Sequence, residues 1–167
     1  MPLWELKMIK EKYLGAYMKS ARVFGNLSAA RRKKVGAIVV KDDRIISIGY
    51  NGMPSGWDNN CEDEIVLQDV AFKEQGGPGL EYSYVGLKTK PEVLHAESNA
   101  IAKLAKSTES GNGASLFVTC APCLECAKMI YQSGIKEVFY AEDYRANDGL
   151  NFLNKCGIFI RKVNEND

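Results

Sequence analysis

The chain contains a single histidine, His95, so any chemistry that requires an imidazole must use this residue. No apolar run approaches the ~20 residues that a membrane span requires, and we expect no contact with a membrane. The net charge is only +1, which offers no broad basic surface, and we expect no nucleic-acid partner. A small anionic ligand remains compatible with this balance, because it needs only a local cluster of cations.

The chain also lacks the features of a disulfide framework. Its 5 cysteines are an odd number, and three of them, Cys120, Cys123 and Cys126, stand close together. The first residues do not form the basic and then apolar pattern of a signal peptide. We therefore expect a cytoplasmic protein with reduced thiols, some of which bind metal. Cys61 and Cys156 stand alone and are expected to be small core residues.

The length of 167 residues suits one domain, and we expect a single domain over residues 1–167. Residues 57–93 have an irregular composition with Gly76-Gly77-Pro78-Gly79 in the middle, which predicts a long irregular insert. The remaining pattern alternates helices and strands and predicts an α/β fold, a three-layer α/β/α sandwich with a central mixed sheet of about five strands. Apolar spacing and turn residues predict helices over 3–24, 100–105, 122–133 and 147–155, and strands over 35–40, 45–48, 115–119, 137–140 and 158–163.

Two short motifs carry the chemistry. The first is His95-Ala96-Glu97, and the second is Pro122-Cys123-Leu124-Glu125-Cys126. Both thiols fall at the start of a predicted helix, three residues apart and on one face. The partial positive charge of a helix N-terminus favours the thiolate, which is the form that binds metal. We therefore expect His95, Cys123 and Cys126 to hold one Zn²⁺ per chain.

The number of ligands distinguishes two kinds of zinc site. Three protein ligands leave a fourth position for water, as in catalytic sites. Glu97 is then placed to take a proton from that water and pass it on, which makes it the candidate catalytic residue. The alternative is a closed structural site in which Cys120 is the fourth ligand. Such a site has no need of Glu97.

The sequence resembles the cytidine deaminase superfamily, and more closely the deoxycytidylate deaminases, including those of bacteriophages. The resemblance extends from about Tyr17 to Val163. It rests on the two metal motifs, which follow the zinc-deaminase pattern His-x-Glu and Pro-Cys-x-x-Cys, and on the loop Gly49-Tyr50-Asn51-Gly52-Met53-Pro54-Ser55-Gly56. It implies a cytidine deaminase-like fold and a zinc-dependent hydrolase that converts dCMP to dUMP for thymidylate synthesis.

The resemblance also implies roles for single residues and for partners. It implies that Asn51 contacts the sugar, that the Ala96 backbone helps to hold the base, and that Tyr144 lies near the phosphate. It implies a homo-oligomer, commonly a hexamer, that Mg²⁺ with dCTP activates and dTTP inhibits. The candidate effector segment is Tyr50, Asn51, Gly52 and Met53, because a glycine-rich loop exposes backbone N–H groups to a ligand.

The cation that meets the phosphate stays open at this stage. The family's phosphate-binding segment lies between the first helix and the first strand, where Arg22 is our candidate. The basic run Arg31-Arg32-Lys33-Lys34 is either a solvated charge run or a second source of phosphate contacts. Alternative functions are a related deaminase acting on a nucleoside, dCTP, guanine or a transfer-RNA adenosine, and a zinc-stabilised interaction domain without catalysis.

Overall fold

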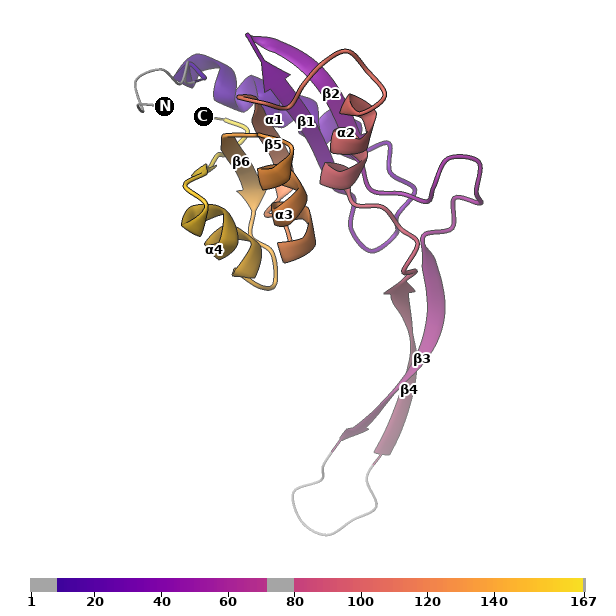
Figure 1. The fold of residues 1–167 in the computed structure, drawn as a ribbon. Helices are drawn as coiled ribbons and strands as arrows, with labels where there is room; N and C mark the ends of the chain where they lie inside the picture. The colour runs from indigo at the N-terminus through magenta and orange to yellow at the C-terminus, as the bar shows by residue number, and fades with distance from the viewer. Residues whose placement is uncertain (1–8, 72–79, 167) are drawn as a thin grey trace.

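A mixed sheet of five strands lies at the centre of the protein (Figure 1). The computed structural model describes residues 9–71 and 80–166. The strands follow the order β2-β1-β5-β6-β7, in which β1 is antiparallel to β2 and β5, and β5, β6 and β7 are parallel. Their bounds are β1 Gly36–Lys41, β2 Arg44–Tyr50, β5 Ser115–Cys120, β6 Glu137–Glu142 and β7 Phe159–Lys162. The expected mixed sheet is confirmed.

Helices cover both faces of this sheet, which confirms the three-layer sandwich (Figure 1). The strand β1 shows how the layers form, because successive side chains point to opposite faces. Ile38 and Val40 pack with the helix α1 (Glu11–Gly25). Ala37 and Val39 pack on the other face with the helices α2 (Ala96–Leu104), α3 (Leu124–Gln132) and α4 (Asp148–Lys155). A strand buried on both faces is nearly continuously apolar, and β1 has this character over residues 36–40, before Lys41.

Two helices begin several residues away from their expected starts. The helix expected over residues 3–24 begins at Glu11, and residues 1–8 lie outside the described part of the chain. The helix expected from Ala100 begins at Ala96, directly after His95. None of the helices in the described ranges is long and apolar enough to cross a bilayer.

The expectation of an irregular insert over residues 57–93 is wrong for most of its length. This segment forms a two-stranded antiparallel hairpin, β3 (Glu62–Ala71) with β4 (Leu80–Thr89), which projects away from the body (Figure 1). Apolar side chains occur on both faces of the ribbon, with Val66 opposite Val85 and Leu67 opposite Tyr84. The sequence therefore lacks the alternation that identifies a half-buried strand. The expected turn signal at residues 76–79 lies outside the described residues.

The end of β2 is fixed against α2 by a close backbone approach. The Ser47 hydroxyl donates a hydrogen bond of 2.7 Å to the Ala100 carbonyl. Two residues later, a Cβ added to Gly49 would lie 2.1 Å from the Ala96 carbonyl oxygen and 2.6 Å from the Ala100 nitrogen. A side chain at position 49 is therefore incompatible with the observed spacing between β2 and α2. This contact holds the start of α2, and with it His95, against the sheet.

We expect Gly49→Ala to lower the free energy of unfolding by about 1–3 kcal/mol or more, because the new methyl group must push α2 away from β2. Gly52→Ala is the control, since a Cβ there meets no atom within 4 Å. Urea denaturation of both variants measures the difference. Equal stabilities would contradict the close packing of β2 on α2.

Candidate active site

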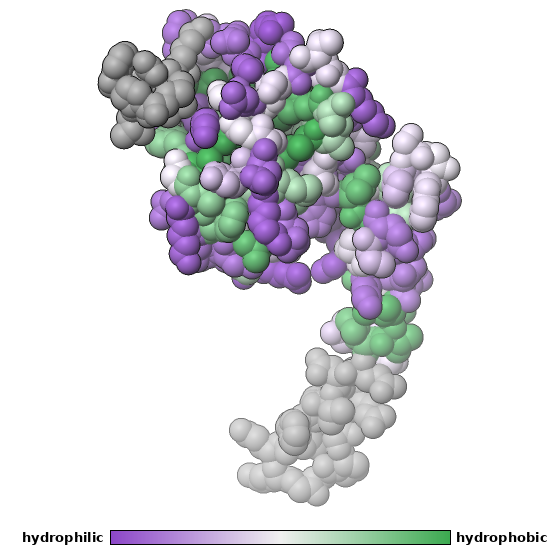
Figure 2. Space-filling view, in the orientation of Figure 1, coloured by the Kyte–Doolittle hydropathy of each residue, from purple (hydrophilic) through white to green (hydrophobic). Residues whose placement is uncertain are grey.

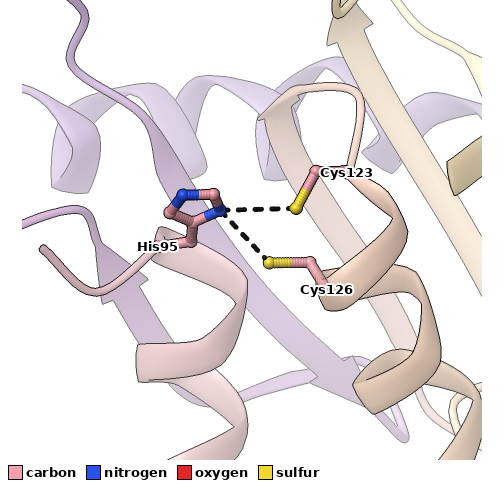
Figure 3. Close-up of side chains that lie close together, drawn as sticks. All are labelled: His95, Cys123 and Cys126. Atoms are coloured by element: carbon pink, nitrogen blue, oxygen red, sulfur yellow. Dashed lines mark hydrogen bonds between the residues drawn. The ribbon is translucent and has the colours of Figure 1, made fainter. Parts of the chain in front are cut away.

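Two helix starts bring one imidazole and two thiols together. His95 immediately precedes α2, Cys123 immediately precedes α3, and Cys126 lies in the first turn of α3. The His95 Nδ1 atom lies 3.6 Å from the Cys123 sulfur and 3.4 Å from the Cys126 sulfur (Figure 3). All three ligand atoms lie within 4.8 Å of one another.

This donor set fits a zinc ion. Zinc–sulfur distances of about 2.3 Å and zinc–nitrogen distances of about 2.0–2.1 Å in a tetrahedron separate the two ligand atoms by about 3.6 Å. The separations from His95 Nδ1 to the two sulfurs, 3.6 and 3.4 Å, agree with that value. Within the described residues the group contains only three ligands and does not include Cys120. The Cys120 sulfur lies instead 3.3 Å from the Lys33 ammonium. The geometry therefore favours an open, three-ligand site over the closed one.

The two thiols differ in acidity. Hydrogen bonds from Cys126 and from His95 lower the pKa of Cys123 to about 3. The hydrogen bond to Cys123, together with burial, raises the pKa of Cys126. The hydrogen bond to Cys123 also raises the pKa of His95. Cys123 is therefore the more acidic of the two thiols, and a sulfur must be deprotonated to bind a metal.

The structure places Glu97 beside this cluster in a buried position. The residue is 4% exposed and lies in the first turn of α2. Burial raises the pKa of Glu97 to about 7, although nearby His95 opposes the shift. A carboxyl group with a pKa near neutrality can both accept and release a proton.

A cavity of about 450 Å³ opens over the cluster and has the size of a small-ligand site. The expected residues Asn51, Ala96, Glu97 and Tyr144 all line it, as do His95 and Cys123. The remaining walls are Arg32, Lys33, Val35, Glu62, Thr89, Val93, Cys120, Ala121 and Arg145. Polar and charged groups thus line one cavity together with the metal-binding cluster.

The Asn51 side chain also holds the cavity wall in place. Its Oδ1 atom accepts a hydrogen bond of 2.8 Å from the Val35 amide, and its Nδ2 group donates one of 2.8 Å to the Lys33 carbonyl. The neighbouring Gly52 exchanges backbone hydrogen bonds of 3.1 and 2.9 Å with Leu94, directly before His95. The loop over residues 50–53 is therefore connected both to the basic segment and to the metal-binding cluster.

The structure does not bring Arg22 to the cavity. Arg22 lies in α1, which packs on the sheet face opposite α2 and α3. It forms ion pairs of 2.8 Å with Glu142 and 2.7 Å with Glu165, at a second and separate hollow. Among the described residues, the cations that line the main cavity are Arg32, Lys33 and Arg145.

Several wall residues had no signal in the sequence. Glu62 and Thr89 lie at the base of the hairpin and reach the cavity only through its fold. The close packing of α4 on the turn before α3 was not predicted from the sequence either. A Cβ added to Gly149 would lie 2.1 Å from the Pro122 carbonyl oxygen. The approach of α4 to the Pro122-Cys123 backbone therefore depends on glycine at position 149.

Comparisons with known proteins agree with this site. The sequence matches the family model of the cytidine and deoxycytidylate deaminase zinc-binding region over residues 11–142. The deoxycytidylate deaminase of Homo sapiens is 37% identical over 146 residues, which cover 81% of this chain and 73% of the human protein. The deoxycytidylate deaminase of Enterobacteria phage T4 is 37% identical over 140 residues, covering 68% of this chain and 69% of the phage protein.

Solved structures give the same result. The crystal structure of the dCMP deaminase from the cyanophage S-TIM5, in complex with dCMP and dUMP, superposes with a TM-score of 0.75. Its sequence is 41% identical, and the match covers 93% of this chain and 100% of the cyanophage chain. From its zinc-binding motifs, its fold and these similarities, the chain belongs to the family of cytidine and deoxycytidylate deaminases with a zinc-binding region.

Proposed function

We propose that the chain, acting as one deaminase domain, hydrolyses dCMP to dUMP and so supplies dUMP for thymidylate synthesis. The observation that carries the proposal is the single cavity that combines the metal-binding cluster, the buried Glu97 and the three cations Arg32, Lys33 and Arg145. One end suits hydrolysis of an amino group, and the cations suit a nucleotide phosphate. The cyanophage relative binds dCMP and dUMP, which supports this choice of ligand.

His95, Cys123 and Cys126 would hold the zinc ion. When bound, zinc would supply an activated water molecule, because coordination lowers the pKa of the water to about 7. The Glu97 carboxylate accepts a proton from the attacking water and delivers it to the pyrimidine ring nitrogen. The Glu97 carboxylate then takes the second proton, from the hydroxyl group that is now bonded to the ring carbon, and passes it to the amino group. The carbon–nitrogen bond breaks, the ring carbonyl forms and ammonia leaves. Burial of Glu97 keeps this proton away from bulk solvent.

The remaining wall residues orient the nucleotide. In this proposal the Ala96 backbone helps to hold the base and Asn51 contacts the sugar. Tyr144 and Arg145 lie side by side, with the Arg145 guanidinium 5.5 Å from the centre of the Tyr144 ring, at the end assigned to the phosphate. Arg32 and Lys33 approach from the loop before β1 and replace Arg22 as the candidates for phosphate contact.

We further propose that the protein is a cytoplasmic homohexamer that Mg²⁺ with dCTP activates and dTTP inhibits. The candidate effector segment, Tyr50 to Met53, is connected to the cavity through Asn51 and to Leu94 through Gly52. A ligand that moves this segment therefore moves groups next to the substrate and to His95. Such a connection is the physical requirement for coupling between two sites.

Replacing either metal-binding thiol should remove the zinc. We expect Cys123→Ser and Cys126→Ser to lose the one zinc per chain that the parent protein retains, because a hydroxyl group is a much weaker zinc ligand. Cys156→Ser is the control outside the cluster, and Cys120→Ser tests the closed site. Elemental analysis of the purified proteins measures the metal. Zinc loss in Cys120→Ser, or zinc retention in both cluster variants, would contradict the three-ligand site.

Replacing the proton carrier should stop turnover and leave the metal in place. Glu97→Gln keeps the shape of the side chain but not its ability to carry a proton, so we expect a loss of about 10²–10⁴ in kcat with dCMP. The control is Glu125→Gln, an exposed acidic residue in the first turn of α3 that pairs with Lys128. If Glu97→Gln retains its zinc and turns over dCMP within about tenfold of the parent, below the usual range for acid–base catalysis, Glu97 is not the proton carrier.

The substrate should require a 5′-phosphate. Two charge-assisted contacts disfavour deoxycytidine against dCMP by a factor on the order of 10²–10⁴ in kcat/KM. We expect Arg32→Gln to reduce this ratio and Lys34→Gln to leave it unchanged, since Lys34 does not line the cavity and its ammonium bonds the Asn26 carbonyl. Steady-state kinetics with both substrates give the ratio. Equal kcat/KM values in the parent protein would point to a nucleoside deaminase.

Regulation should be visible in the shape of the saturation curve. We expect a sigmoidal response to dCMP that Mg²⁺ with dCTP makes more hyperbolic and that dTTP makes more sigmoidal. Light scattering on the same sample gives the oligomeric state. A monomer with a hyperbolic curve and no response to either triphosphate would remove the regulatory proposal and leave the catalytic one intact.

A further inference from the structure

The side chains of the basic run at residues 31–34 do not all reach the cavity. Arg32 and Lys33 line the cavity. Arg31 turns away toward the hairpin, where its guanidinium lies 3.2 Å from the Glu64 carboxylate. These consecutive cations belong to the segment between α1 and β1, which has no helix or strand and no regular hydrogen-bonding pattern of its own. Groups elsewhere in the fold must therefore hold Arg32 and Lys33 in place.

A buried carboxylate at the base of the hairpin binds the backbone of this basic segment. Glu62, the first residue of β3, is 1% exposed. Its Oε1 atom accepts backbone hydrogen bonds from Arg31 and Arg32 at 3.1 and 3.2 Å, and its Oε2 atom accepts one from Arg31 at 3.1 Å. Burying a carboxylate is costly unless it is hydrogen-bonded or paired with a cation, and Glu62 meets this condition through the basic loop. Both carboxylate oxygens bind the protein's own backbone.

The residue opposite Glu62 in the hairpin completes the contact. Thr89 is paired with Glu62 in the register of β3 and β4. The Arg32 guanidinium donates a hydrogen bond of 3.0 Å to the Thr89 hydroxyl. This pair of residues therefore fixes the loop backbone through Glu62 and directs the Arg32 side chain through Thr89.

We infer that Glu62 and Thr89 are positioning residues that hold Arg32 at the phosphate end of the cavity, so that the hairpin base sets the selectivity for a phosphorylated substrate. This inference rests on the proposed function. Like charges in the run repel one another and favour a spread-out loop. The Glu62 carboxylate offsets this repulsion and orders the loop before the substrate binds, which lowers the entropy cost of binding. Its loss should therefore weaken ground-state binding of the phosphate and leave proton transfer at Glu97 largely intact.

The test compares Glu62→Gln and Thr89→Val with Glu64→Gln in the zinc-loaded protein. In Glu62→Gln an amide NH₂ group replaces one carboxylate oxygen and faces the backbone N–H groups of Arg31 and Arg32, to which it cannot bond as an acceptor. We expect its KM for dCMP to rise about ten- to hundredfold with kcat within about threefold, and its kcat/KM for deoxycytidine to stay unchanged. Thr89→Val should shift KM in the same direction by a smaller factor. Glu64→Gln, on the same strand and with a 64% exposed side chain, should match the parent.

Hydrogen exchange followed by mass spectrometry gives a second, substrate-independent measurement. Peptides spanning residues 26–35 should exchange faster in Glu62→Gln than in Glu64→Gln. The inference would be overturned if both Glu62→Gln and Thr89→Val kept the parent's ratio of kcat/KM for dCMP to kcat/KM for deoxycytidine, whether or not the two values fell together. If Glu62→Gln does not fold, Thr89→Val decides. If the parent itself does not turn over dCMP, the proposed function fails, and the exchange rates still decide whether Glu62 holds the loop.

Discussion

The helices α2 and α3 begin side by side on one face of the sheet, and the site depends on this juxtaposition. It brings one imidazole nitrogen within 3.6 Å of two sulfurs that a zinc ion can bridge. The same arrangement buries Glu97 in the first turn of α2. Two close backbone contacts hold these helix starts. Gly49 of β2 packs on the start of α2, and Gly149 of α4 packs on the backbone directly before α3. Small displacements of either helix would separate the ligands, because packed interiors have no spare volume.

The cavity combines two groups of charged side chains. Beside the metal-binding cluster are the acidic thiol of Cys123, whose pKa hydrogen bonds from Cys126 and His95 lower, and the Glu97 carboxyl group, whose pKa burial raises to about 7. The other walls carry Arg32, Lys33 and Arg145. Lys33 also pairs with Glu142 at 3.0 Å, which in turn pairs with Arg22. Arg22 thus contacts Glu142, the partner of Lys33, and does not itself line the cavity.

Short spacings within single elements predicted the helices and strands of the sandwich and each of the two metal motifs. The Pro-Cys-x-x-Cys motif, for example, needs only a helix start. The pairing of the two motifs followed from the zinc-deaminase pattern. The hairpin was missed because Val66 and Leu67, which are neighbours in sequence, point to opposite faces and hide the strand period. Arg22 was misplaced, and Glu62 was not identified, because ion pairs and backbone contacts between distant segments leave no periodic pattern in a sequence.

The central claim is that one cavity binds both the cytosine ring and the phosphate of dCMP. A crystal structure of zinc-loaded Glu97→Gln with dCMP tests it most directly, because the variant should hold the substrate without turning it over. The account predicts the cytosine amino group at the His95, Cys123 and Cys126 cluster, with the phosphate at Arg32, Lys33 or Arg145. A phosphate bound at Arg22, or a base bound away from the cluster, would contradict it.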